Sequence, residues 1–304
     1  MAHQILRLSL SDSRCRDRRA KARPTRVEPA SIVSVTSPSS KPLTYSSYLK
    51  IDELLSLQQP RSGGPGRAAE HDETLFIVIH QVYELWFKQV LHELAHLQRS
   101  LDADDAPTAL DTFKRILTIL KTLVGQVDVL ETMTPVQFSS FRTRLDSASG
   151  FQSAQFREVE FVLGKKRQGM ARHHPEGSPG RDRLEALLDR PTLWDSFLGF
   201  LARRGYAVPE EHLGRDLSSP IEASPAIQEI LLAVYRGDHL ARQMSERMVD
   251  LDEGIQEWRY RHVKMVERTI GAKPGTGGSP GAEYLRKTLF EPLFPDLWEV
   301  RSRL

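Results

Sequence analysis

The chain has 304 residues, of which 39% are hydrophobic and 27% charged, a composition typical of globular proteins rather than of disordered or fibrous ones. The single cysteine, Cys15, excludes an intrachain disulfide and a zinc site built from cysteines, as expected for a reducing, cytoplasmic location. The formal net charge is only +2, and no apolar stretch approaches the roughly 20 residues that span a bilayer, so neither a nucleic-acid partner nor a membrane partner is expected.

Residues 1–41 are expected to form a disordered basic leader. Lysine and arginine clearly outnumber acidic residues in this stretch, and it lacks the apolar segment of a secretory signal. Asp12, Asp17 and Glu28 suit an organelle transit peptide poorly. Order is expected from about Pro42, so residues 42–304 are predicted to form a single domain.

Apolar residues recur at helical spacing through most of the remaining chain. Gly150 and the Gly/Pro-rich loops expected at 60–68, 165–182 and 273–281 interrupt the pattern. Thr134 is a predicted N-cap, followed by Pro135 and, three residues after the cap, Gln137. No segment alternates with period two, so the predicted fold class is all-α, a bundle of long helices. The predicted helices are 43–57, 72–99, 108–132, 135–149, 151–162, 183–203, 225–250, 251–270 and 282–288.

Two histidines lie inside apolar stripes of long predicted helices. At about 100° per residue, His80 falls within the apolar arc of 72–99, and His262 falls near the centre of the stripe of 251–270. A single core-facing imidazole is most often a hydrogen-bonded packing residue. Two of them in an all-α chain favour a bundle that holds haem or another metal. Spacing leaves open which histidine binds and which metal is bound.

A second pair of histidines, His92 and His96, completes an HExxH sequence with Glu93, the signature of zinc proteases. The helical wheel places both histidines opposite the apolar stripe, whereas a zinc protease buries this face at the floor of its cleft. No third ligand stands at an obvious spacing. The favoured interpretation is therefore that this helix face is a polar surface. A zinc peptidase using His92 and His96 is the alternative.

Several long blocks, in the right order, resemble the tryptophan 2,3-dioxygenase family. They are HDETLFIVIHQVYELWFKQVLHEL at 71–94, FSSFRTRLDSASGFQSAQFR at 138–157 and WRYRHVKMVERTIGAKPGTGGSPG at 258–281. YSSYL at 45–49 and the FPDLWEVR ending match as well, so the resemblance covers nearly everything from about residue 42 onwards. It implies a helical bundle of the tryptophan/indoleamine dioxygenase type, with a haem pocket between long helices.

The resemblance also implies a role for individual residues. His262 matches the proximal ligand to the iron of one haem b per subunit, and His80 matches the distal, catalytic histidine beside the indole nitrogen. Arg142 matches the residue that pairs with the substrate carboxylate, and Thr276 matches the contact to the substrate ammonium and carboxylate. The other matched substrate-binding positions are Phe76, Phe138, Ser149, Gly150, Tyr45, Tyr48 and Leu49. The last three belong to an N-terminal segment that, in the implied homotetramer, reaches a neighbouring subunit.

The implied reaction is the haem-dependent cleavage of the C2–C3 bond of L-tryptophan by O2 to N-formyl-L-kynurenine, the first step of the kynurenine route. The residue types suit it, because a single imidazole from His262 leaves one axial position of the iron open. Arg142 can hold a carboxylate through two parallel hydrogen bonds. We expect His80 to orient the indole N–H rather than to act as an obligatory base. The alternatives are a haem monooxygenase or peroxygenase acting on a modified indole, and a non-catalytic haem or tryptophan sensor.

Overall fold

The computed structural model describes residues 42–276 and 281–304, so the predicted leader and part of the predicted 273–281 loop lie outside it. Within these residues the regular elements are helices, apart from one isolated bridge between Gly64 and Arg67. The predicted all-α class is therefore confirmed. No helix in the described ranges is long and apolar enough to cross a membrane. The chain divides into two compact units, the first ending at Ile51 and the second beginning at Asp52.

The predicted helix 43–57 is wrong in one respect, because it is divided into α1 (Tyr45–Leu49) and α2 (Ile51–Leu55). Thr44 caps α1 by accepting a hydrogen bond from the backbone N–H of Ser47, whose side chain in turn accepts from the N–H of Thr44. Lys50 ends α1 in the left-handed conformation, with φ of 54°, and its N–H bonds to the carbonyl of Ser46. This turn breaks the helical register that the sequence pattern suggests.

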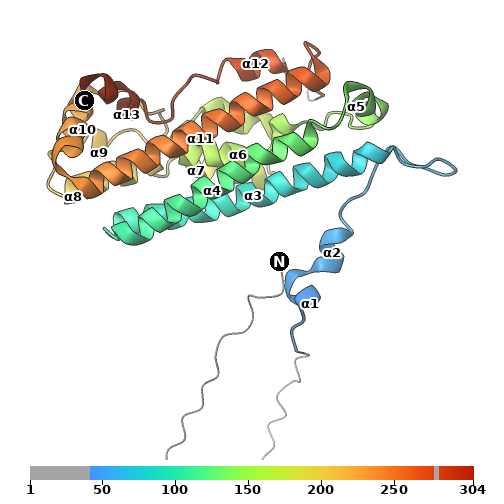
Figure 1. Ribbon diagram of the computed structural model, residues 1–304, viewed down its shortest axis with the longest axis horizontal. Helices are drawn as coiled ribbons and strands as arrows, with labels where there is room; N and C mark the ends of the chain where they lie inside the picture. Colours follow the sequence, from blue (N-terminus) through green and yellow to red (C-terminus); the bar gives the residue numbers. More distant parts are fainter. Residues whose placement is uncertain (1–41, 277–280) are drawn as a thin grey trace, which may run out of the picture. The chain divides into compact units, whose positions relative to one another are not determined.

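Three long helices, α3 (His71–Asp102), α4 (Ala106–Leu130) and α11 (His239–Ile270), run side by side in the second unit (Figure 1). The first two confirm the predicted helices 72–99 and 108–132 to within a few residues. The predicted boundary between residues 250 and 251 is wrong. α10 (Pro225–Gly237) ends much earlier, and Asp238 caps α11 by accepting the N–H groups of Leu240 and Ala241. An aspartate N-cap satisfies otherwise unpaired N–H groups, so it begins the helix there.

Shorter helices cover the bundle. Thr134 and Gln137 form the predicted capping box of α5 (Pro135–Arg142), but this helix ends well before the predicted break at Gly150, which instead begins the 3-10 turn η1 (Gly150–Gln152). The predicted loop 165–182 is wrong in part, because it contains η2 and the start of α7, and the predicted helix 183–203 is divided where Thr192 caps α8. The remaining elements are α6 (Ala154–Val162), η2 (Gln168–His173), α7 (Pro179–Leu188), α8 (Leu193–Arg203), α9 (Glu210–Leu213), α12 (Ala282–Arg286), α13 (Pro295–Glu299) and η3 (Val300–Arg303).

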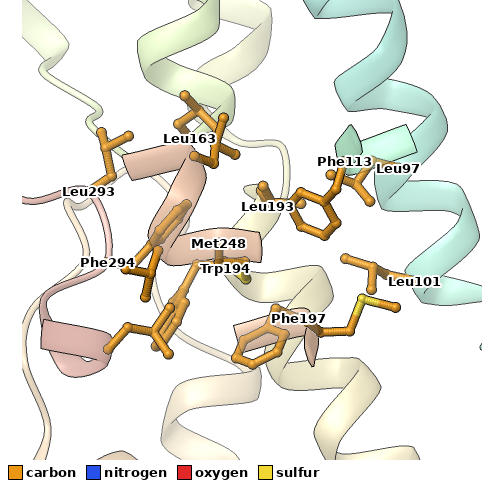
Figure 2. Close-up of a cluster of buried hydrophobic side chains, with 14 of the residues drawn as sticks. Leu97, Leu101, Phe113, Leu163, Leu193, Trp194, Phe197, Met248, Leu293 and Phe294 are labelled. Atoms are coloured by element: carbon orange, nitrogen blue, oxygen red, sulfur yellow. The ribbon is translucent and has the colours of Figure 1, made fainter. Parts of the chain in front are cut away.

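The main hydrophobic core joins the long helices to α8 and to the C-terminal segment. Figure 2 shows Leu97 and Leu101 of α3, Phe197 of α8 and Phe294 near the C-terminus converging in this core, where each is essentially inaccessible to solvent. Buried Asp252 ties the C-terminal segment to α11, since its carboxylate accepts hydrogen bonds from two backbone N–H groups and one indole N–H, at 2.8–3.2 Å. This packing leaves the other end of the bundle, near α5, for the site described next (Figure 1).

Candidate functional site

A cavity of about 250 Å³ lies between the N-terminal half of α3 and the C-terminal half of α11, with α5, α6 and the segment 271–276 completing its wall. Its lining is mostly apolar, with a few polar and charged groups, as in many ligand pockets. The structure brings together at this cavity the predicted site residues Phe76, His80, Phe138, Arg142, Ser149, Gly150, His262 and Thr276. Tyr45, Tyr48 and Leu49 belong to the first unit, where their side chains are exposed, and their role stays a prediction.

His262 presents an imidazole without a hydrogen bond to any residue in the described ranges. Its ring stacks on that of Trp258, one turn earlier on α11, with 5.1 Å between centroids and 5° between planes. Burial lowers the pKa of His262 to about 4, with smaller contributions from the charges of His80 and Arg157. The ring is therefore neutral at pH 7 and has a lone pair free, which is the state in which histidine binds a metal.

His80 lines the same cavity but is held differently. Its Nδ1 lies 2.7 Å from the carbonyl oxygen of Phe76. A carbonyl oxygen can only accept, so Nδ1 carries the hydrogen and Nε2 keeps the lone pair. Burial lowers the pKa of His80, against the opposing effects of the Phe76 carbonyl and of Glu84. The ring consequently offers a neutral hydrogen-bond acceptor to whatever occupies the cavity.

Arg142 and Thr276 come from distant parts of the chain and are held by two backbone contacts. Arg142, the last residue of α5, donates from Nη2 to the carbonyl of Pro274 at 2.6 Å. Thr276 donates from Oγ1 to the carbonyl of Ala148 at 2.5 Å. No carboxylate among residues 42–276 and 281–304 pairs with Arg142. This guanidinium therefore retains N–H donors for an anionic ligand.

Aromatic rings form much of the wall around the two histidines. The ring of Phe76 lies 4.1 Å from that of His80 and 5.7 Å from that of Phe138, centroid to centroid. Beneath His262, Trp258 packs 4.8 Å from Phe156 on the same measure. Flat apolar surfaces of this kind suit a planar aromatic ligand or macrocycle.

A group of buried charges in the cavity wall was not predicted from the sequence. Arg157 and Glu160 of α6 and Arg259 of α11 line the cavity, and each is at most 6% exposed. Glu160 accepts from Arg157 at 2.5 Å and from Arg259 at 2.8 Å. Burial raises the pKa of Glu160, but the two arginines more than offset it, so this pKa lies below its ordinary value. The helical spacing of Arg259 and His262 was the signal, since residues three apart share a face.

The HExxH sequence does not form a metal site in the described part of the chain. His92 is exposed, whereas Glu93 is buried and pairs with Arg115 at 3.1 Å. Glu93 also accepts a hydrogen bond from Gln89 at 2.7 Å. No cluster of three or more potential metal-ligating side chains is present in residues 42–276 and 281–304. The zinc-peptidase alternative therefore has no support here.

Comparison with proteins of similar sequence identifies a family. The sequence model of the tryptophan 2,3-dioxygenase family matches residues 33–177 and 223–304. A tryptophan 2,3-dioxygenase from Herpetosiphon aurantiacus is 62% identical over 265 residues, covering 87% of this chain and 100% of the relative. Its counterpart from Anaeromyxobacter sp. strain K is 60% identical, covering 89% and 100%. The one from Kineococcus radiotolerans is 44% identical, covering 86% and 91%.

Proposed function

Because the chain belongs to the tryptophan 2,3-dioxygenase family, we propose that it cleaves the indole C2–C3 bond of L-tryptophan with O2. Both oxygen atoms enter the product, N-formyl-L-kynurenine, so no other reductant or oxidant is needed. This reaction is the first step of tryptophan catabolism by the kynurenine route.

The unequal bonding of the two imidazoles carries the proposal. His262 has no hydrogen bond within the described ranges, whereas Nδ1 of His80 is committed to the Phe76 carbonyl. One histidine is thus free to bind a metal, and the other offers an acceptor at a defined nitrogen. A dioxygenase that holds both a cofactor and an indole in one cavity needs this division of roles.

Haem b is the proposed cofactor, held by His262. The residues fit it, since the neutral imidazole stacks on Trp258 and the surrounding wall is rich in aromatic rings. When bound, haem would supply the iron at which O2 can react. We propose one haem per subunit.

Protein side chains would bind and orient the substrate. Arg142 has N–H groups left for the tryptophan carboxylate. Thr276 lies close by in the chain segment whose Pro274 carbonyl accepts a hydrogen bond from Arg142, and its hydroxyl would contact the substrate ammonium and carboxylate. His80 would accept the indole N–H at Nε2. Phe76 and Phe138 would pack against the indole, with Ser149 and Gly150 completing the pocket. Fixing both ends of the substrate sets the position of C2–C3, which is catalysis by orientation.

The assembly and location are also proposals. We propose a homotetramer in which Tyr45, Tyr48 and Leu49 reach a neighbouring subunit's pocket, because these apolar side chains are exposed in their own unit. A cytoplasmic location is consistent with a chain whose only cysteine is Cys15.

The test is an absorption spectrum of the purified, reduced protein, followed by addition of L-tryptophan and O2. We expect a haem Soret band and then steady growth of N-formylkynurenine absorbance. A Soret band without that product would favour the monooxygenase or sensor alternatives. Protein that takes up no haem would overturn the proposal. In a His262→Ala variant the Soret band should be weakened or shifted while the circular dichroism of the helices is kept.

A further inference from the structure

The chain segment that carries Thr276 begins and ends at two glycines with the same backbone conformation. Gly271, directly after α11, has φ of 62° and ψ of −132°, and Gly281, directly before α12, has φ of 65° and ψ of −135°. Steric clashes disfavour this conformation for residues that carry a Cβ atom. Backbone conformation therefore favours glycine equally at the two positions, and only their surroundings differ.

Gly281 packs closely against another part of the backbone, whereas Gly271 does not. A Cβ atom at Gly281 would lie 2.7 Å from the carbonyl oxygen of Lys273, inside van der Waals contact. A Cβ atom at Gly271 would meet no atom of the described residues within 4 Å. The absence of a side chain at Gly281 thus allows the chain to return to Lys273 at close range, as at the base of a compact loop.

Helix α12 fixes the Gly281 side of this contact. Ala282, the first residue of α12, is only 4% exposed. Arg286 of the same helix donates from Nε to Glu267 of α11 at 2.6 Å. Lys273, by contrast, is exposed. A side chain at position 281 would therefore displace Lys273 and the residues that follow it, rather than α12.

The segment 273–276 carries a group proposed to bind the charged end of the substrate. The carbonyl of Pro274 accepts from Arg142, and the Thr276 hydroxyl donates its hydrogen to Ala148. With this hydrogen committed, the hydroxyl oxygen can only accept, which suits the ammonium group of an amino acid. Arg142 belongs to α5 and keeps N–H groups for the carboxylate. A shift of the segment would therefore disturb mainly the contact between Thr276 and the ammonium group.

Resting on the proposed function, we propose that Gly281 is a positioning residue for substrate recognition. Its missing side chain permits the close approach to Lys273, and this approach holds Thr276 where its hydroxyl meets the substrate ammonium. Gly281 acts only through Thr276, since it has no functional group of its own. Alanine at this position should therefore weaken recognition of the ammonium group and leave the binding of the indole and the carboxylate unchanged.

The experiment compares two ligands in the same haem-loaded protein, with ferric iron so that no turnover occurs. L-tryptophan and indole-3-propionate share the indole and the carboxylate, but only L-tryptophan has the ammonium group. Both dissociation constants are read from the ligand-induced shift of the Soret band. We expect Gly281→Ala to bind L-tryptophan at least about tenfold more weakly, the size expected from one lost hydrogen bond to a charged group. It should bind indole-3-propionate as the wild type does, whereas loss of folding would lower the binding of both ligands.

Two further comparisons test whether the effect passes through Thr276. Gly271→Ala is the matched control, because it introduces the same backbone strain without the contact to Lys273. It should keep the wild-type ratio of the two dissociation constants. Thr276→Val should weaken the binding of L-tryptophan by itself. Adding Gly281→Ala to Thr276→Val should then cause little further loss, since both changes remove the same contact.

Each outcome separates this inference from the proposed function. If the wild type binds neither ligand, the proposed substrate site itself fails. If the wild type binds L-tryptophan no more tightly than indole-3-propionate, that site stands, but the ammonium group is not recognised and the inference is overturned. It is also overturned if Gly271→Ala changes the ratio as much as Gly281→Ala does, or if the losses in Gly281→Ala and Thr276→Val add in the double variant.

Discussion

Replacement of His80 by alanine separates two possible roles of this residue. Its Nδ1 donates to the Phe76 carbonyl, so Nε2 can accept one hydrogen bond from the indole N–H. Both groups in that bond are neutral. Such a bond contributes about 0.5–1.5 kcal/mol, so its loss should lower kcat/KM by about twofold to tenfold. An obligatory general base contributes about 10²- to 10⁴-fold. We therefore expect the small effect.

The assay is the rate of N-formylkynurenine formation at saturating O2, with the Soret spectrum recorded for each variant. His92→Ala is the matched control, because His92 lies exposed on the same helix and outside the cavity. Loss of all turnover in His80→Ala, with haem content and tryptophan affinity intact, would refute the orienting role and favour a base. An unchanged kcat/KM would show that the indole does not bond to His80. Because burial lowers the pKa of His80 below 6.5, the wild-type acid limb of kcat/KM should also lie below pH 6.5.

Arg142→Met should raise KM for tryptophan about 10- to 100-fold, as expected for lost charge-assisted hydrogen bonds at a partly exposed site, and leave the ferrous haem spectrum unchanged. Exposed Arg144→Met is the control, and an unchanged KM in Arg142→Met would exclude the carboxylate role. Glu160 has a pKa below its ordinary 4.5 because its two arginine partners outweigh burial, so it stabilises the fold above pH 4.5 and this stability is lost as the pH falls further. Urea unfolding between pH 6 and 3 should therefore show a flatter decline for Glu160→Gln than for the wild type; parallel curves would contradict the assigned pKa. Zinc chelators should leave activity intact, as should joint replacement of His92 and His96 by alanine; loss of activity in either case would revive the zinc alternative.

Local pattern predicted the helices where the chain carries its own signals. Thr134, Pro135 and Gln137 mark the start of α5 in sequence and in structure. The boundary at Asp238 was missed, because the apolar residues of α10 and α11 recur with the same helical period, so the pattern does not mark where one helix ends and the next begins. The turn at Lys50 was missed for a related reason, since a non-glycine residue in the left-handed conformation leaves no mark in the pattern. Capping and turn geometry decide such boundaries.

The sequence by itself determined that His80 and His262 face inwards, because helical period is a local property that assigns each side chain to a face. Helical period could not determine that both imidazoles line one cavity, which only the family resemblance implied, or that Nδ1 of His80 meets a carbonyl. It also did not reveal that Arg259 reaches Glu160 of α6, far away in the chain. Those relations depend on how helices pack across long sequence separations, where side-chain contacts rather than spacing select partners. Tertiary structure therefore decided which charged side chains border the cavity and how they pair.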